Sequence, residues 1–228
     1  MPVIDLSQTS RRALNSELHA LAPETNETYW RVEKPNGQHA LAVGLNAPVT
    51  VEIAGHAGYY CAGMNKLATV IVGGNVGVGV AENMISGKVH VKGDASQSAG
   101  ATAHGGLLVI DGDASARCGI SMKGVDIVVK GSIGPMSAFM AQSGNLVVLG
   151  DAGDALGDSI YEARLFVRGS VKSLGADCVE KEIREEHLDL LQKLLKKAEI
   201  NGVEVSEFKR YGSARTLYNF HVDNAAAY

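Results

Sequence analysis

The chain has 228 residues, a mass of 23.9 kDa and a formal net charge of −4 at pH 7. This mildly acidic balance excludes the strongly basic surfaces that bind nucleic acid or anionic membranes, and 46% hydrophobic residues exclude a disordered chain. No apolar run approaches the roughly 20 residues of a transmembrane helix, and the first residues lack a signal-peptide pattern. We therefore expect a cytoplasmic protein that binds neither nucleic acid nor membrane.

Residues 1–47 show no regular repeat and are predicted to form an N-terminal cap on the repetitive part of the chain, which begins at residue 48. The segment from Ser10 to Leu21 is predicted to form a short helix, because its leucines recur at helical spacing on one side. Residues 29–43 are predicted to form a β-hairpin around the turn sequence Pro-Asn-Gly at 35–37. We place the boundary of this N-terminal cap at residue 47.

Residues 48–178 are organised by a repeat of 19 residues. Each repeat contains a glycine at the same position. Branched aliphatic residues occur two and four positions before this glycine, and only alanine or glycine occurs seven positions after it. Spacing by two places the aliphatic side chains on one face of a short strand, and equivalent positions of a solenoid stack on one another. The most regular position of the repeat is glycine, at Gly55, Gly74, Gly93, Gly112, Gly131, Gly150 and Gly169.

This repeat predicts an all-β fold, a right-handed parallel β-helix of seven 19-residue coils whose core is formed by the aliphatic positions. Each coil needs its neighbours to bury its own aliphatic face, so the coils are predicted to form one continuous rod. The competing left-handed β-helix of acyltransferases is built on a six-residue subperiod, which this sequence lacks.

Residues 179–228 form the third region, a helix followed by an aromatic tail. The segment from Val179 to Ala198 is predicted to be an amphipathic helix that ends at Asn201-Gly202. Aromatic residues anchor many protein interfaces, so the tail is a candidate interface, with packing against the chain's own rod as the alternative. Its candidate interface residues are Phe208, Tyr211, Tyr218 and Phe220.

A second candidate interface lies three positions before each repeat glycine, on the outward face of the predicted strands. Glu52 and His90 are polar there, but the other five residues are apolar. A strand face in contact with water should carry polar residues, so this surface needs a cover. The cover is either the helix predicted for 179–198 or another protein. The apolar residues concerned are Ile71, Val109, Val128, Val147 and Phe166.

The sequence yields no set of catalytic, cofactor-binding or metal-binding residues. The glycine-rich run 73–79 lacks the following helix or Lys-Ser/Thr pair of a phosphate-binding loop. Cys61 and Cys118 are three coils apart, too far to form a disulfide or share a metal ion, and Cys178 occupies another position of the repeat. Three histidines also fall at different positions and do not converge: His56, His90 and His104.

Three aspartates directly follow repeat glycines and admit two interpretations. Short polar side chains at this position typically bond to nearby backbone, which favours a role in the turns for Asp94, Asp113 and Asp151. Stacked carboxylates could instead line the groove of a polysaccharide-cleaving enzyme. Ser132 interrupts the series, and the coils offer no aromatic platform for a sugar, so the turn interpretation is favoured.

The coils resemble the G-x-x-G-x-x-x-G repeat of the C-terminal domain of the glutamate synthase large subunit. The segments that carry this resemblance are 93–100, 112–119 and 150–157, and the stretch 9–14 is similar to the one that leads into that domain. The resemblance covers roughly residues 3–180. It implies a seven-turn right-handed β-helix that contributes no catalytic residues of its own.

The length, the predicted helix and the segment 211–220 are similar to the free-standing β-helix subunits of N-methylglutamate synthases (methylamine–glutamate N-methyltransferases). This implies a complex that converts methylamine and L-glutamate to N-methyl-L-glutamate and ammonia. The implied partners are a glutamine amidotransferase-like subunit and a glutamate synthase-like flavoprotein, which would carry the FMN and the iron–sulfur cluster. The same repeat also occurs in the C subunits of formylmethanofuran dehydrogenase and of formyltransferase/hydrolase complexes, which remain the alternative.

Overall fold

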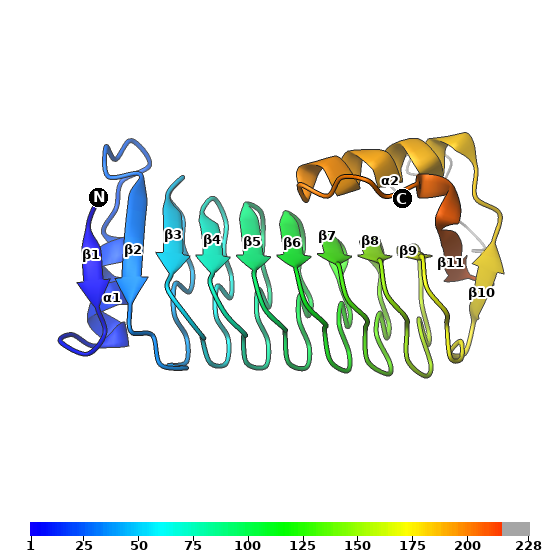
Figure 1. Ribbon diagram of the computed structural model, residues 1–228, viewed down its shortest axis with the longest axis horizontal. Coiled ribbons are helices and arrows are strands. Elements are labelled where there is room, and N and C mark those ends of the chain that lie inside the picture. Colours follow the sequence, from blue (N-terminus) through cyan, green and yellow to red (C-terminus); the bar gives the residue numbers. More distant parts are fainter. Residues whose placement is uncertain (216–228) are drawn as a thin grey trace.

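The computed structural model describes residues 1–215, which form a rod of stacked coils (Figure 1). Its strands make one 11-stranded sheet in the order β1-β2-β3-β4-β5-β6-β7-β8-β9-β11-β10. This confirms the predicted all-β parallel solenoid. The strands of the repeating coils are β3 (Thr50–Ile53), β4 (Thr69–Val72), β5 (Lys88–Val91), β6 (Leu107–Ile110), β7 (Lys123–Val129), β8 (Ser143–Val148) and β9 (Arg164–Val167).

Equivalent positions of successive coils pair with one another, as the 19-residue period requires. Val51 pairs with Val70 and Val70 with Val89, in parallel register, and the same register continues to β9. Both aliphatic positions of each strand are buried inside the rod. A second line of parallel bridges, beginning at Ala57 and Val76, runs along the other side of the coils. The interior is therefore a continuous stack of aliphatic side chains.

The repeat glycines allow the backbones of adjacent coils to approach closely. A Cβ atom at Gly112 would collide with the side chain of Asp94 and would lie 2.9 Å from the carbonyl oxygen of Gly93. The small residues seven positions after each glycine have a different cause, because most of them adopt left-handed backbone, as at Gly119 with φ +69°. Branched side chains are strained in that conformation, which accounts for the restriction to alanine and glycine.

The N-terminal region extends the parallel sheet, and the hairpin predicted for residues 29–43 is wrong. β1 (Val3–Asp5) pairs in parallel with β2 (Tyr29–Glu33), and β2 pairs in parallel with β3. Trp30 and Val32 are buried in line with the aliphatic positions of β3, so burial favours a coil-like path over a hairpin turn. The helix predicted for 10–21 is confirmed as α1 (Arg11–His19), with the Oγ of Ser10 accepting a hydrogen bond from the N–H of Ala13 at 3.2 Å.

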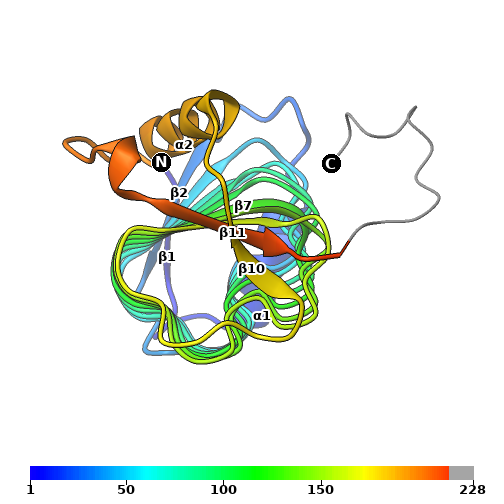
Figure 2. The same ribbon diagram turned by 90° about the vertical axis from the view of Figure 1, so that its right-hand side faces the viewer.

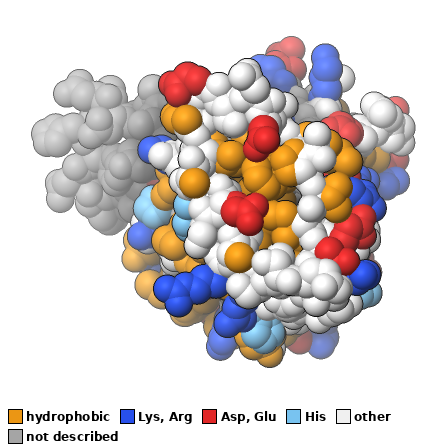
Figure 3. Space-filling model, turned by 90° about the vertical axis from the view of Figure 1, so that its left-hand side faces the viewer, with side chains coloured by type: hydrophobic (Ala, Val, Ile, Leu, Met, Phe, Trp, Pro, Cys, Tyr) orange, Lys and Arg blue, Asp and Glu red, His pale blue; other side chains and the backbone are white. Residues whose placement is uncertain are grey.

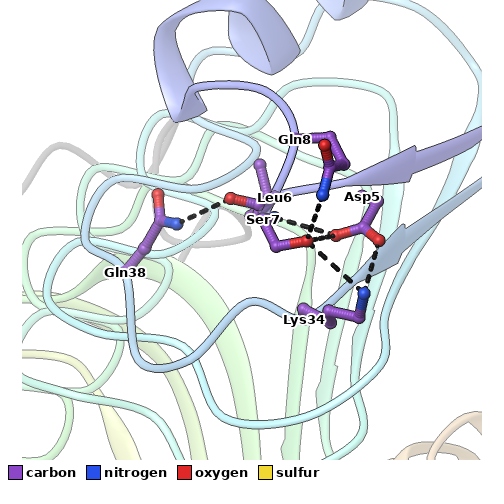
Figure 4. Close-up of polar contacts among 6 residues, drawn as sticks. All are labelled: Asp5, Leu6, Ser7, Gln8, Lys34 and Gln38. Carbon is purple, nitrogen blue, oxygen red and sulfur yellow. Dashed lines mark hydrogen bonds and ion pairs between the residues drawn. The ribbon is translucent and has the colours of Figure 1, made fainter.

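A small polar network fastens the turn that follows β1 (Figure 4). The carboxylate of Asp5 accepts hydrogen bonds from Lys34 Nζ at 2.7 Å and from the N–H and hydroxyl of Ser7 at 2.8 and 2.7 Å. The hydrogen bond from Lys34, followed by those from Ser7, lowers the pKa of Asp5 to about 2. The network joins the end of β1 to the segments that follow β1 and β2.

The C-terminal end is closed by antiparallel strands and a helix. β9 pairs with β11 (Lys209–Ser213), which pairs with β10 (Cys178–Lys181). The helix predicted for 179–198 is shorter than expected, because Val179 pairs with Gly212 in the sheet and α2 spans only Glu185–Lys197. A short 3-10 helix, η1 (Val205–Glu207), precedes β11. Figures 1 and 2 show α2 lying along one side of the rod, above the outward face of its last strands.

Candidate functional site

The outward face of the strands has a covered half and an open half. In the covered half, formed by β6 to β9, α2 packs on the outward residues and a second apolar cluster fills the space between them. In the open half, formed by β2 to β4, the outward residues are Arg31, Glu52 and Ile71, and none of them belongs to that cluster. His90 on β5 lies between the two halves. The chain's own helix α2 therefore covers most of the outward apolar residues of the strands.

Most of the apolar candidate residues lie beneath the chain's own helix, which is one of the two covers that the sequence allowed. Val109, Val128, Val147 and Phe166 are fully buried beneath α2, and Phe208 is buried in the same cluster. These five side chains are therefore not accessible to another protein in the described chain. Tyr211 is also buried, on the side of the sheet that faces the main core.

Three further interface candidates have different outcomes. Ile71 is only partly buried and remains on the open half. Tyr218 and Phe220 lie outside the described residues, so the expectation for them stays a prediction.

Charged side chains mark the boundary where the cover ends. Asp111 lies 2.9 Å from His90 Nε2, 2.7 Å from Lys130 Nζ and 3.6 Å from Lys92 Nζ. Burial alone would raise the pKa of Asp111, but the hydrogen bonds from Lys130 and His90 hold that pKa below its usual value. The outward face thus changes from apolar to charged within one coil.

The open half is polar, as expected of a strand face in contact with water. Glu52 accepts a hydrogen bond from the hydroxyl of Tyr29, and its other carboxylate oxygen lies 2.5 Å from Nη1 of Arg31. Arg31 also pairs with Glu33 at 2.5 Å. The contacts of Glu52 with Tyr29 and Arg31 join β3 to β2, whereas the Arg31–Glu33 pair lies within β2. The ion pairs are partly exposed and resemble ordinary surface pairs of a sheet.

The aspartates that follow the repeat glycines bind backbone of the next coil, which confirms their interpretation as turn residues. Asp94 accepts a hydrogen bond from the N–H of Asp113 at 2.9 Å, and Asp113 accepts one from the N–H of Ser132 at 2.7 Å. Asp151 accepts the N–H and the hydroxyl of Ser170 at 2.7 and 2.9 Å. The series forms a ladder along the rod. One oxygen of each carboxylate is therefore engaged with the adjacent coil.

The thiols are isolated and buried. Burial raises the pKa of Cys61 and of Cys118 to about 12, and the pKa of Cys178 to about 11, so none is a thiolate at neutral pH. The glycine-rich run 73–79 stacks directly on the preceding coil, because a Cβ atom at Gly77 would lie 2.7 Å from the carbonyl carbon of Gly58. The three cysteines and the glycine-rich run 73–79 therefore contribute to the packing of the coils.

The three histidines singled out in the sequence have different surroundings. His56 Nδ1 accepts a hydrogen bond from the N–H of Asn75 at 2.8 Å, at the start of the series of turn hydrogen bonds along the rod. His90 lies beside Asp111 at the boundary between the two halves, and His104 is exposed. Within residues 1–215, no group of three or more His, Cys, Asp or Glu side chains could hold a metal ion.

A basic pocket that the sequence did not reveal lies at the C-terminal end of the rod. It lies where α2 begins beside β9, β10 and β11, and five cationic side chains line it. They come from separate segments that only the antiparallel strand pairs bring together, so spacing in the sequence carried no signal. The cations are Arg164, Lys181, Arg184, Arg210 and Arg215.

The N-terminal end has a different character. Figure 3 shows hydrophobic side chains gathered on this end of the rod, with acidic side chains around them. Met1 is 75% exposed and Val3 is 56% exposed, and Val3 lies on β1, the edge strand of the sheet. The rod therefore ends in an apolar surface on one side and in a cationic pocket on the other.

Comparison with known proteins gives one informative match. Protein GlxC from Rhizobium meliloti (strain 1021) is 65% identical to the chain over 228 residues, which is 100% of both sequences. No family model matches, and no solved structure matches. Among the described residues, neither helix is long and apolar enough to cross a membrane.

Proposed function

The chain belongs to the family of Protein GlxC, and on this premise we propose that it is the non-catalytic scaffolding subunit of a glutamate synthase-like heteromeric complex. The name Protein GlxC states no activity, so the proposal draws its content from the fold and from the repeat. The G-x-x-G-x-x-x-G coils support it, since they resemble the β-helix domain of glutamate synthase, where the β-helix holds no reacting group.

The observation that carries this proposal is how the solenoid uses its polar side chains. The short polar residues that follow the repeat glycines are engaged with backbone N–H groups of the adjacent coil, as in the steps from Asp94 to Asp113 and from Asp113 to Ser132. The interior positions are aliphatic and buried. Both features stiffen a stack of coils, and a stiff rod is suited to hold two other proteins at a fixed separation.

We further propose that the complex is an N-methylglutamate synthase. In this reading the glutamate synthase-like flavoprotein partner carries FMN and an iron–sulfur cluster, and the amidotransferase-like partner handles the amine. The reaction converts methylamine and L-glutamate to N-methyl-L-glutamate and ammonia. The rod contributes by fixing the two partners so that a small amine can pass between them.

The test is reconstitution of the full chain with both candidate partners. The tagged chain is co-expressed with the amidotransferase-like and flavoprotein subunits, singly and together, and the products are measured by light scattering after size exclusion and by flavin absorbance. We expect a ternary complex with flavin absorbance, and N-methyl-L-glutamate formation only when all three chains are present. A soluble chain that binds neither partner would overturn the proposal.

Adding a metal-dependent amidohydrolase-like subunit to the co-expression experiment separates the alternative complexes. The repeat is shared with the C subunits of formylmethanofuran dehydrogenase and of formyltransferase/hydrolase complexes. If the chain binds a metal-dependent amidohydrolase-like subunit and not the flavoprotein, the assembly serves formyl transfer and the N-methylglutamate assignment is wrong. If the chain forms product from methylamine and L-glutamate alone, the scaffolding role itself is wrong.

A further inference from the structure

The row of outward-facing residues on the strands extends past the covered half and ends in the basic pocket at the C-terminal end of the rod. Phe166 on β9 pairs with Arg210 on β11, and Arg210 pairs with Lys181 on β10, so these side chains follow one another along the same face. Figure 2 looks onto this end of the rod, with β10 and β11 in front and α2 to one side. Apolar packing under α2 thus gives way to cations where the helix begins.

Gly212 makes room for the pocket. It is paired with Val179 in the antiparallel strands and lines the pocket, two residues beyond Arg210 on the same face. A Cβ atom added at Gly212 would meet its nearest neighbours, the carbonyl oxygen of Ala163 and two carbons of Lys181, at 3.8 to 4.0 Å. These are ordinary contacts. Crowding therefore does not require glycine at this position, and Gly212 keeps one wall of a pocket of about 310 Å³ free of a side chain.

The charge of the pocket is strongly one-sided although the chain is acidic overall. Five cationic side chains line it against two carboxylates, those of Glu162 and Glu186. The N-terminus of α2, a helix of 13 residues, adds further positive potential at the same place. Two of the five cations have carboxylate partners at the rim, because Arg215 pairs with Asp177 at 2.5 Å and Arg184 with Glu182 at 3.4 Å. Within residues 1–215, Lys181 and Arg210 form no ion pair, so they are the cations available to an anion.

Arg210 is the centre of this cluster. Its Nη1 donates to the carbonyl oxygen of Glu182 at 2.9 Å, but its Nε is buried and, within residues 1–215, has no hydrogen-bond partner. Burial, then the charges of Arg164 and Arg184, lower the pKa of Arg210. A buried guanidinium N–H without an acceptor is costly, and a bound oxyanion would supply one.

The neighbouring groups are arranged to donate as well. Lys181 is half-buried and forms no ion pair with any described residue. His187 Nδ1 accepts the N–H of Arg184 at 3.0 Å, which leaves Nε2 as the ring's donor. Burial, followed by the charge of Arg210, lowers the pKa of His187, which favours the neutral ring. The pocket is thus lined by donors of several kinds.

We propose that this pocket binds a small oxyanion of the carboxylate or phosphate class, held by Arg210 and Lys181 above Gly212. Guanidinium groups recognise carboxylate and phosphate through paired N–H donors, and the pocket is of a size that small organic anions occupy. The inference concerns the chain alone and does not depend on the proposed complex. A loss of anion binding and a loss of complex formation can therefore be observed separately.

The experiment is isothermal titration of the full chain with three probes of defined chemistry. Inorganic phosphate and glutarate are the two oxyanions, and glutaramide is the uncharged analogue of glutarate. We expect at least one oxyanion to bind, with an affinity that falls as sodium chloride is added, and glutaramide not to bind. Binding of phosphate alone or of glutarate alone assigns the class. The absence of binding by both anions at millimolar concentration, or equal binding of glutaramide, would overturn the proposal.

Two variants locate the binding. Arg210→Gln removes the central guanidinium, and Gly212→Val fills the space above it with a residue that suits a strand. Each should weaken binding at least tenfold, while Gly212→Val keeps the unfolding midpoint of the parent. Lys172→Gln is the control, because Lys172 pairs with Asp154 outside the pocket at 2.7 Å, and it should bind like the parent. Unchanged affinity in Gly212→Val would show that the anion binds elsewhere.

Discussion

The covered and open halves of the outward strand face have the same backbone and register but different side chains. Where α2 lies above the strands, the outward residues are Val109, Val128, Val147 and Phe166, all fully buried. Beyond the helix they are Arg31, Glu52 and the partly buried Ile71. His90, at the boundary, is buried but paired with a carboxylate.

The solenoid backbone determines the direction in which each side chain points, and whether that direction faces protein or water determines which residues are tolerated there. Inward positions meet the same surroundings in every coil and are uniformly aliphatic. Outward positions meet either a helix or water, and their polarity changes where the helix ends. His90, which looks like an interruption of an apolar series in the sequence, therefore marks the limit of the covered half, and Glu52 lies two coils beyond it on the open half.

The largest effect should come from placing a charge at the same outward position in the two halves. Val128→Asp puts a carboxylate into the dry cluster beneath α2 and should destabilise the protein by roughly 3 kcal/mol or more. Ile71→Asp places the same group on the open half and should cost about 1 kcal/mol or less. Urea unfolding of both variants measures the difference. Equal losses would show that α2 does not protect the covered half in solution.

The next effect concerns the helix side of the same cluster. Leu191 is fully buried on α2, so Leu191→Ala should cost about 2–4 kcal/mol. Because coils of a solenoid depend mainly on their neighbours, the loss should appear first as faster hydrogen exchange in α2 and on β7 to β9, with β3 and β4 unchanged. Lys193→Ala, at an exposed position of the same helix, is the matched control. Uniformly faster exchange along the whole rod would contradict this separation.

Much of this comparison could be predicted from sequence, and the rest depended on contacts between distant segments. The coils were predictable because inward aliphatic residues and glycines repeat at a fixed period. The hairpin prediction failed because the turn residues Pro35 to Gly37 sit inside a coil whose spacing to the next strand is slightly longer, so the repeat was not visible there. Val179 was assigned to a helix because periodicity alone could not show its pairing with Gly212.

The candidate sites follow the same rule. The turn role of the aspartates was predictable, since it is local to one position of the repeat. The cover over the outward apolar residues could not be identified from sequence, because amphipathic periodicity shows that a helix has an apolar face but not which surface that face meets. The basic pocket gave no signal at all, because Arg164 and Arg210 are brought together only by the antiparallel return of β11.

A smaller effect is expected at the boundary between the halves. The lowered pKa of Asp111 means that its contacts with Lys130 and His90 stabilise the fold above the ordinary aspartate pKa, and that this stabilisation is lost as the pH falls through the lowered value. Asp111→Asn should therefore reduce stability at pH 7 by about 1 kcal/mol, the partly exposed pair being screened by water. The difference from the parent should shrink under acid conditions. A difference that stays constant down to the most acid pH would assign the effect to packing.

The smallest effect is expected at the open end, where the network around Asp5 fastens the turn after β1. Its pKa of about 2 implies that the carboxylate stays charged until the pH falls to that value, so the network is complete from its ordinary pKa upward and is lost as the pH approaches 2. Lys34→Gln removes the strongest hydrogen-bond donor to Asp5 and should return its pKa towards the ordinary value, as measured by NMR titration of the side-chain carboxyl carbon. Lys66→Gln, at an exposed position on another coil, is the control. Because the network is local, the amide hydrogens of β1 should exchange faster in Lys34→Gln, while the exchange of those beneath α2 remains unchanged. Faster exchange beneath α2 as well would show that the two halves of the rod are coupled.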